Sequence, residues 1–250
     1  RSQRIKEYPM VTKLNEASLL NSTQKFRLIE VKEGLNFDGQ AEALPHVNRL
    51  SYDLASACRK RFSLDMDFVL GKVSQIQLAT LLQEATASFS YRNDLDEAYW
   101  KNEPRVSLYG CFYNVEGIPN GAYYYDSTTH ELRKVHPGDY RLQLQSGMSL
   151  DNVNLLQVPL CLHVAGDRES FRTALGYRGY RIQQMEAGML VQRLLLAASA
   201  LGMGGHPLLG FDANMSDEIY GMVPKGKTSL IQIPIGPYRQ RPWLKGSLHS

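Results

Sequence analysis

The chain has 250 residues and a net charge of +3, with 43% of its residues hydrophobic and 21% charged. These proportions are typical of a folded domain and exclude general disorder. The basic residues are scattered apart from two short clusters, "CRKRF" and "RQRPWLK". Because this pattern does not resemble a nucleic-acid-binding tail, we expect no nucleic-acid partner.

The cysteine and hydropathy patterns narrow the class of protein further. Cys58, Cys111 and Cys161 are widely spaced and form no CxxC pair, which argues against a disulfide framework and a structural zinc, so we expect no metal and a cytoplasmic location. The most apolar stretch, 185–201, is interrupted by polar residues and is too short to cross a bilayer, so we expect no membrane partner. The chain begins with Arg1, which leaves open a stand-alone protein or an excised domain.

The first third of the chain predicts short elements followed by two helices. Residues 26–37 alternate as a strand or hairpin arm does, and 36–46 have the composition of a loop. A helix is predicted from Ser51 to the "CRKRF" cluster, and a second from Ser74, its candidate N-cap. We expect the second helix to bury Ile76, Leu78, Leu81, Leu82 and Ala85.

The middle of the chain predicts a β-rich region. Residues 105–135 read as strands separated by a Gly-Ile-Pro-Asn-Gly turn and a Ser-Thr-Thr turn. The five tyrosines between 109 and 125 are interpreted as sheet residues with solvated hydroxyls rather than as a stacking platform. The apolar run 157–167 predicts a buried strand, in which His163 is a core histidine with satisfied hydrogen bonds.

A long apolar segment precedes a glycine-rich loop. Residues 185–201 are apolar on nearly every side and predict a helix buried all round, such as one shared across a subunit interface, with Gly188, Gln192, Leu195 and Ser199 on one face. The following "GMGGHPLLG" is either a helix stop, with Gly202 or Gly204 at the C′ position, or a loop that presents main-chain N–H groups to a ligand. Residues 228–236 predict a last strand, and the whole pattern predicts an α+β fold.

Three separated pieces suit a phosphorylated, planar cofactor. The end of the first predicted helix offers Ser56, Cys58, Arg59, Lys60 and Arg61 as donors to a phosphate. The glycine-rich loop offers backbone amides from Gly205 onward, and Arg239 and Arg241 lie two residues apart beyond the last strand. Each piece alone is a weak signal, because a charged helix end is usually only a solvated surface.

Together these pieces resemble the nitroreductase-like flavoprotein superfamily. The section "GHPLLGFDANMSDEIYGMVPKGKTSLIQIPIG" parallels that family's Pro-x-x-Gly-Phe-Asp turn, helix and Lys-Gly-x-Thr-Ser-Leu strand. "SACRKRF" matches its phosphate motif only in part, since Cys58 and Ser56 stand where the family has serine and arginine. The resemblance implies a central, mainly antiparallel sheet flanked by helices, and a homodimer around the long helix with FMN at the interface. The implied FMN contacts are Ser56, Cys58, Arg59, Lys60, Gln192, Gly205, Arg239 and Arg241, with Leu209 and Gly210 near flavin N5.

Within that superfamily the chain is most similar to the azoline dehydrogenases. The resemblance implies FMN-dependent oxidation of a thiazoline or oxazoline to a thiazole or oxazole. Relatives that modify peptides carry a Lys-Tyr pair where this chain has Ala174 and Leu175, which points to the relatives acting on carrier-protein-tethered intermediates of nonribosomal peptide synthetases. Tyr177 and Tyr180 are then the nearest candidate bases.

The alternatives stay open at this point. One is a peptide azoline dehydrogenase, and another is an NAD(P)H-dependent nitro- or quinone reductase. A third is a flavin-fold remnant that acts only as a docking module. We expect residues 1–50 to form an N-terminal extension that either caps the fold or docks a synthetase, and residues 51–250 to form the FMN-binding domain.

Overall fold

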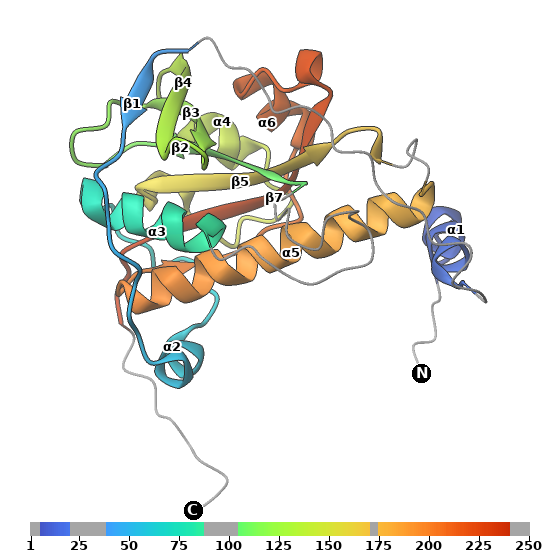
Figure 1. The fold of residues 1–250 in the computed structure, drawn as a ribbon, viewed down its shortest axis with the longest axis horizontal. Helices are drawn as coiled ribbons and strands as arrows, with labels where there is room; N and C mark the ends of the chain where they lie inside the picture. Colours follow the sequence, from blue (N-terminus) through green and yellow to red (C-terminus); the bar gives the residue numbers. More distant parts are fainter. Residues whose placement is uncertain (1–5, 21–38, 88–104, 171–174, 241–250) are drawn as a thin grey trace, which may run out of the picture.

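The computed structural model describes residues 6–20, 39–87, 105–170 and 175–240. In these residues a seven-stranded sheet runs in the order β1-β4-β3-β2-β5-β7-β6, and every neighbouring pair is antiparallel (Figure 1). The predicted α+β fold with a mainly antiparallel sheet is confirmed. The strands are β1 (Ala41–Ala43), β2 (Ser107–Phe112), β3 (Gly121–Asp126), β4 (Glu131–Pro137), β5 (Leu160–Asp167), β6 (Gly204–Gly205) and β7 (Lys227–Gly236).

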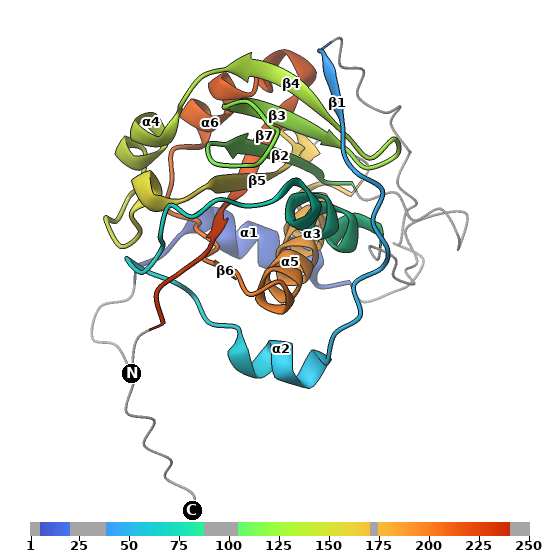
Figure 2. The same ribbon diagram turned by 90° about the vertical axis from the view of Figure 1, so that its left-hand side faces the viewer.

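Helices cover both faces of this sheet. On one face α3 and α5 pack side by side, and on the other lie the shorter α4 and α6 (Figure 2). Each face has its own buried apolar cluster, so β5 near the middle is buried over almost its whole length, as its continuous apolar run predicts. The helices are α1 (Pro9–Ser18), α2 (Leu54–Lys60), α3 (Gln75–Ala87), α4 (Arg141–Ser146), α5 (Tyr177–Ala200) and α6 (Ala213–Ile219), with 3-10 turns η2 (Leu155–Gln157) and η4 (Val223–Lys225).

The start of α3 is fixed by a reciprocal cap. Ser74 Oγ accepts a hydrogen bond from the Gln77 backbone N–H, and Gln77 Oε1 accepts one from the Ser74 N–H. The predicted N-cap is therefore confirmed, as a capping box. The predicted burial of Ile76 is wrong, since 63% of its surface is exposed. Ile76 lies two residues before Leu78 and so faces nearly the opposite side of the helix, whereas the other four predicted residues share one face and are fully buried.

The N-terminal fifty residues contribute directly to the sheet. The expected loop at 36–46 contains β1, which pairs with β4, so that part of the prediction is wrong. A three-residue strand is too short to show an alternating pattern in the sequence, because it forms only through its pairing with β4. Leu44 is buried, and Glu84 of α3 accepts hydrogen bonds from the Leu50 backbone and the Arg49 guanidinium. The expected strand at 26–37 lies outside the described residues.

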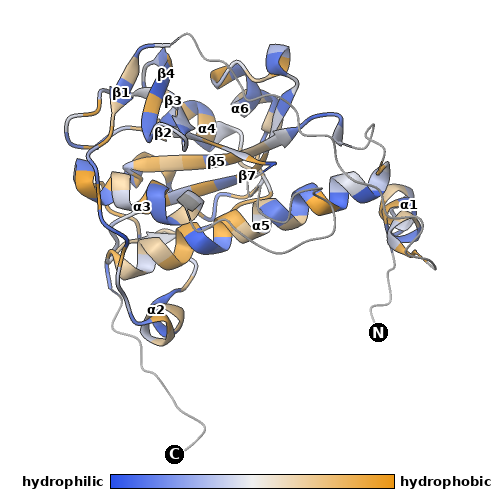
Figure 3. Cartoon of the chain, in the orientation of Figure 1, coloured by the Kyte–Doolittle hydropathy of each residue, from blue (hydrophilic) through white to orange (hydrophobic). Residues whose placement is uncertain are grey.

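Helix α5 is exposed along one stripe, which corrects the prediction of burial on all sides. Arg181, Met185, Gly188 and Gln192 recur at helical spacing and are all exposed, with Met185 at 63%. Figure 3 shows polar and apolar residues side by side along the whole helix. The helix lies in one layer, so the sheet and α3 cover only its inner face. A Cβ atom at Gly188 would meet no atom within 4 Å.

Two side-chain predictions in the β-region can be checked directly. Tyr109, Tyr123 and Tyr125 are buried strand residues, as expected, and Tyr113, which is also buried, directly follows β2. Their hydroxyls are not generally solvated, because those of Tyr109 and Tyr113 have no exposed surface. Both tyrosines belong to the apolar cluster on the α4–α6 face, which the helices close off from water.

Candidate functional site

A narrow crevice lies where the end of α2, the last turns of α5 and strand β6 meet. It encloses about 200 Å³ including its open mouth. Figure 2 shows α2 beneath the end of α5, with β6 beside it. The crevice is lined by Lys60, Arg61, Phe62, Leu195, Ser199, Met203, Gly204, Gly205 and Tyr238.

The cations of this crevice come from the last turn of α2. Asp53 caps the start of the helix by accepting hydrogen bonds from the Ala55 and Ser56 backbone N–H groups. Ser199 Oγ of α5 donates to the Ala57 carbonyl at 3.2 Å, which docks α2 against the long helix. A cation at a helix C-terminus is favoured by the helix dipole, so Lys60 is stable at the position where it faces the crevice.

The glycine-rich loop begins with the helix stop that one reading of its sequence predicts. Gly202 has φ +75° and stands just after the helix, while the Met203 N–H donates to the Ala198 carbonyl at 2.8 Å. This is a Schellman motif, so the predicted helix stop is confirmed with Gly202 at C′. The next two glycines form β6 and line the crevice, where a Cβ atom at Gly204 would overlap the Leu64 side chain and one at Gly205 would lie 2.7 Å from Leu195.

Leu209 and Gly210 lie outside the crevice lining, farther along the same segment. This segment follows the edge of β7, since the His206 N–H donates to the Pro234 carbonyl and Leu208 pairs with Gln232. Leu209 is 76% exposed, and the Gly210 carbonyl accepts a hydrogen bond of 2.8 Å from the Ser149 N–H.

The other predicted cofactor contacts within the described residues do not line the crevice. Ser56 is half-buried, whereas Cys58 and Arg59 are exposed on α2. Gln192 is exposed on α5. Arg239 is also exposed and directly follows the lining residue Tyr238. Arg241 lies outside the described residues, and so does Ala174.

The two candidate bases are far from this crevice within one chain. Tyr177 begins α5 and Tyr180, 38% exposed, follows one turn later. Ser199 is 19 positions after Tyr180 on the same helix, a separation of about 28 Å at the rise of an α-helix. The structure therefore does not bring these tyrosines together with Lys60 or Gly205.

Sequence reasoning did not predict several lining residues as contacts, among them Ser199, Met203 and Tyr238. Tyr238 stacks edge-on against Phe62, with ring centroids 5.4 Å apart, and so closes one side of the crevice. Tyr238 directly precedes Arg239 of the predicted basic pair, and this position in the sequence could have indicated that it lies at the cofactor site. The sequence contains no such indication for Met203, because only the Schellman turn after α5 brings it to the crevice that Lys60 of α2 also lines.

Apart from the crevice, polar side chains also form a buried hydrogen-bonded network on the α4–α6 face of the sheet. His163 Nε2 lies 3.1 Å from Gln232 Oε1, and its Nδ1 lies 2.8 Å from the Tyr220 hydroxyl. Burial lowers the pKa of His163 to about 4. His163 is therefore a neutral, fully hydrogen-bonded core residue, as predicted.

Metal and membrane features are not found in the described part of the chain. No group of three or more His, Cys, Asp or Glu side chains there could hold a metal ion. None of the described helices combines the length and apolar character needed to cross a bilayer.

Comparisons with known proteins identify relatives of this sequence. A sequence model described as the Nitroreductase family matches residues 108–236. A Methanocaldococcus jannaschii protein named as a nitroreductase is 24% identical over 163 residues, which cover 63% of this chain and 80% of that protein. An oxygen-insensitive NAD(P)H nitroreductase of Enterobacter cloacae is 44% identical over 46 residues, or 18% of this chain and 21% of that enzyme.

Solved structures share the fold. A protein of Anabaena variabilis named as a nitroreductase superposes with a TM-score of 0.67 at 23% identity. That superposition covers 80% of this chain but only 42% of the Anabaena chain, so this chain spans less than half of that relative. The Escherichia coli microcin synthetase McbBCD complex, with truncated pro-MccB17 bound, gives a TM-score of 0.58 at 20% identity and covers 91% of this chain and 87% of that one. The expected nitroreductase-like fold is confirmed.

Proposed function

Because the chain belongs to the nitroreductase family, we propose that it is an FMN-dependent oxidoreductase. The observation that carries this proposal is the crevice, which combines two cations, two hydroxyls and glycine backbone. Lys60 and Arg61 suit a phosphate dianion, and the hydroxyls of Ser199 and Tyr238 suit the polar chain that links it to the flavin ring.

The glycines support the same assignment. Gly204 and Gly205 line the crevice without side chains of their own, so a ligand there meets main chain. In this proposal Leu209 and Gly210 lie beside the flavin's N5 edge, and Gln192, Arg239 and Arg241 supply the further contacts that the sequence resemblance implies. Bound FMN supplies a hydride acceptor, and the chain orients it and shields it from water.

We propose that two copies of the chain complete the site. Within one chain the crevice is open at its mouth, whereas ligand sites typically bury most of the ligand's surface. The exposed stripe of α5 that contains Met185 and Gly188 is the natural contact for a second copy, because Gly188 permits close approach of another backbone. Residues 1–50 then act as a cap, since β1 and Leu50 are fastened to the core.

We further propose that the substrate is a thiazoline or oxazoline tethered to a carrier protein of a nonribosomal peptide synthetase. The sequence resemblance to azoline dehydrogenases supports this, and the fold likeness to the microcin synthetase complex is compatible with it. Tyr177 or Tyr180 is the proposed base. At about 28 Å from Ser199, Tyr180 can serve only the crevice of a second subunit.

The second candidate function is an NAD(P)H-dependent nitro- or quinone reductase. The local identity to the Enterobacter cloacae enzyme favours it. Rapid bleaching of the flavin by NADPH under anaerobic conditions would select the reductase. Conversion of a carrier-bound thiazolinyl thioester to a thiazole, with a loss of two mass units, would select the oxidase.

A third reading makes the chain a non-catalytic docking module. The incomplete phosphate motif, in which Ser56 and Cys58 replace arginine and serine, motivates it. A colourless protein that takes up no FMN and still binds a carrier-bearing module would select this reading.

The visible absorption spectrum of the purified protein tests the general class. We expect flavin bands and release of FMN on denaturation. Lys60→Glu should abolish FMN retention, whereas Lys72→Glu, an exposed lysine outside the crevice lining, should retain it. Failure of the wild-type protein to bind FMN at high concentration would overturn the proposal.

A further inference from the structure

Two loops are joined directly beside Gly210. The Ser149 N–H donates to the Gly210 carbonyl, and the Asp212 N–H donates to the Gly147 carbonyl, both at 2.8 Å. A Cβ atom at Gly210 would lie 3.2 Å from the Ser149 Cβ, so the two backbones are in close contact. The position of residues 209–210 is therefore set by the loop that follows α4.

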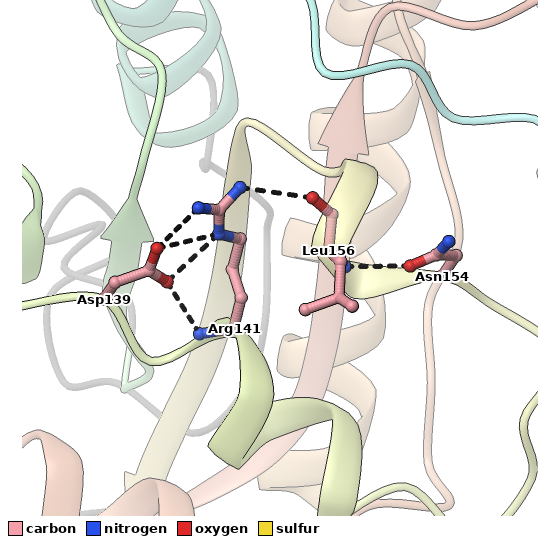
Figure 4. Close-up of polar contacts among 4 residues, drawn as sticks. All are labelled: Asp139, Arg141, Asn154 and Leu156. Carbon is pink, nitrogen blue, oxygen red and sulfur yellow. Dashed lines mark hydrogen bonds and ion pairs between the residues drawn. The ribbon is translucent and has the colours of Figure 1, made fainter.

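That loop is itself fastened at both ends. The Gln145 side chain donates to the Val153 carbonyl at 3.2 Å and accepts from the Leu155 N–H at 2.7 Å, which closes the loop across its base. Arg141 adds a second tie, since its guanidinium binds the Asp139 carboxylate and donates to the Leu156 carbonyl (Figure 4). These hydrogen bonds hold the loop of residues 147–154 in a defined conformation.

Each loop presents a leucine to solvent. Leu150 is 70% exposed and Leu209 is 76% exposed. They adjoin Ser149 and Gly210, the two residues in backbone contact, so the leucines flank one point on the surface. Large exposed apolar side chains on braced backbone are typical of sites that bind an apolar group.

We propose that Leu150 and Leu209 determine substrate specificity by contacting an apolar substituent next to the reacting ring. This inference rests on the proposed function, which puts the flavin's N5 edge at Leu209–Gly210. A ring presented to that edge has its substituents against the loop that carries Leu150. Because the exposed side chains of Leu150 and Leu209 are both apolar, the surface favours an apolar substituent over a charged one.

Binding of product-like ligands tests this without turnover. The probes are two thiazoles, one with an isobutyl and one with a 2-hydroxyethyl substituent, titrated against FMN-loaded protein by calorimetry. We expect the wild-type protein to bind the isobutyl compound at least about 10-fold more tightly, since each buried methylene favours binding. In Leu150→Asp, and separately in Leu209→Asp, that preference should fall below about 3-fold.

The control is Ile76→Asp. Ile76 is an exposed residue of leucine size on α3, which packs on the opposite face of the sheet from α4 and α6. This variant should keep the wild-type preference. An unchanged preference in Leu150→Asp and Leu209→Asp, or no preference in the wild-type protein, overturns the inference. Conversion of a dimer to a monomer by these two variants also overturns it, because the leucines would then be an interface between copies. The flavin spectrum of each sample separates these outcomes from failure of the proposed function, in which FMN itself is absent.

Discussion

The hydroxyl of Tyr220 lies 2.8 Å from Nδ1 of His163, and both side chains are fully buried between the sheet and α6. Because Nε2 of the same ring faces the Gln232 side-chain oxygen, Nε2 carries the proton and Nδ1 accepts from the tyrosine. The imidazole is therefore held in one neutral tautomer, which has a direct consequence for stability in acid.

We expect the protein to lose stability as the pH falls from about 6.5 towards 4. The unfolded chain binds a proton at His163 near its ordinary pKa of 6.5, whereas the folded protein does so only near 4. Stability therefore rises with pH inside this window, by up to about 1.4 kcal/mol per pH unit from this group. Urea unfolding followed at several pH values measures the slope.

The His163→Gln variant separates this histidine from other titrating groups. Glutamine does not titrate, so the slope between pH 4 and 6.5 should become shallower even if the variant is less stable overall. His136→Gln, at an exposed position on β4, is the matched control and should keep the wild-type slope. Equal slopes in all three proteins would contradict the assignment.

Removing the cap of α3 should lower stability modestly. In Ser74→Ala the Gln77 N–H loses its acceptor, which costs about 1 kcal/mol in typical N-cap substitutions. Chemical denaturation checks this value. Ser51→Ala, at an exposed position before α2, should change stability by less than about 0.5 kcal/mol, and a similar loss in both variants would argue against a specific cap.

Two glycine-to-alanine substitutions should have opposite effects. Gly204→Ala places a methyl group into the fully buried Leu64 side chain, so we expect a loss of about 1–3 kcal/mol. Gly188→Ala meets no atom within 4 Å on a helical position, so we expect a gain of about 0.5–1 kcal/mol for an isolated subunit. Thermal unfolding of both variants at low protein concentration is the measurement, and a destabilised Gly188→Ala would contradict the open environment of that position.

Glu186 should be among the most sensitive charged positions. Its carboxylate is almost fully buried and pairs with the guanidinium and backbone N–H of Arg105. Glu186→Ala leaves the arginine charge without this partner in a partly buried position, so we expect a loss of about 3 kcal/mol. Glu131→Ala, which breaks a more exposed pair with Arg133, should cost less than about 1 kcal/mol. Denaturant midpoints that differ little between the two variants would show that burial of Glu186 is energetically unimportant.

Local chemistry made much of this fold predictable. The capping box at Ser74, the C′ glycine at Gly202 and the apolar run around His163 each reflect interactions within a few residues or a single strand, so their patterns are visible in the sequence. β1 was missed because a strand of three residues forms there only by pairing with β4, which is distant in the chain. The prediction for Ile76 was wrong for a local reason, because the helical period places it nearly opposite the buried face formed by Leu78, Leu81, Leu82 and Ala85.

The sequence by itself determined the α+β class, the order of the main strands and helices and the family resemblance, because composition, periodicity and short motifs act through neighbouring residues. Only the tertiary structure decided that Lys60, Ser199, Gly205 and Tyr238 share one crevice, and that one stripe of α5 stays exposed. The physical reason is that a periodic pattern states which face of an element is apolar, whereas the packing of distant elements decides what covers that face and which side chains meet.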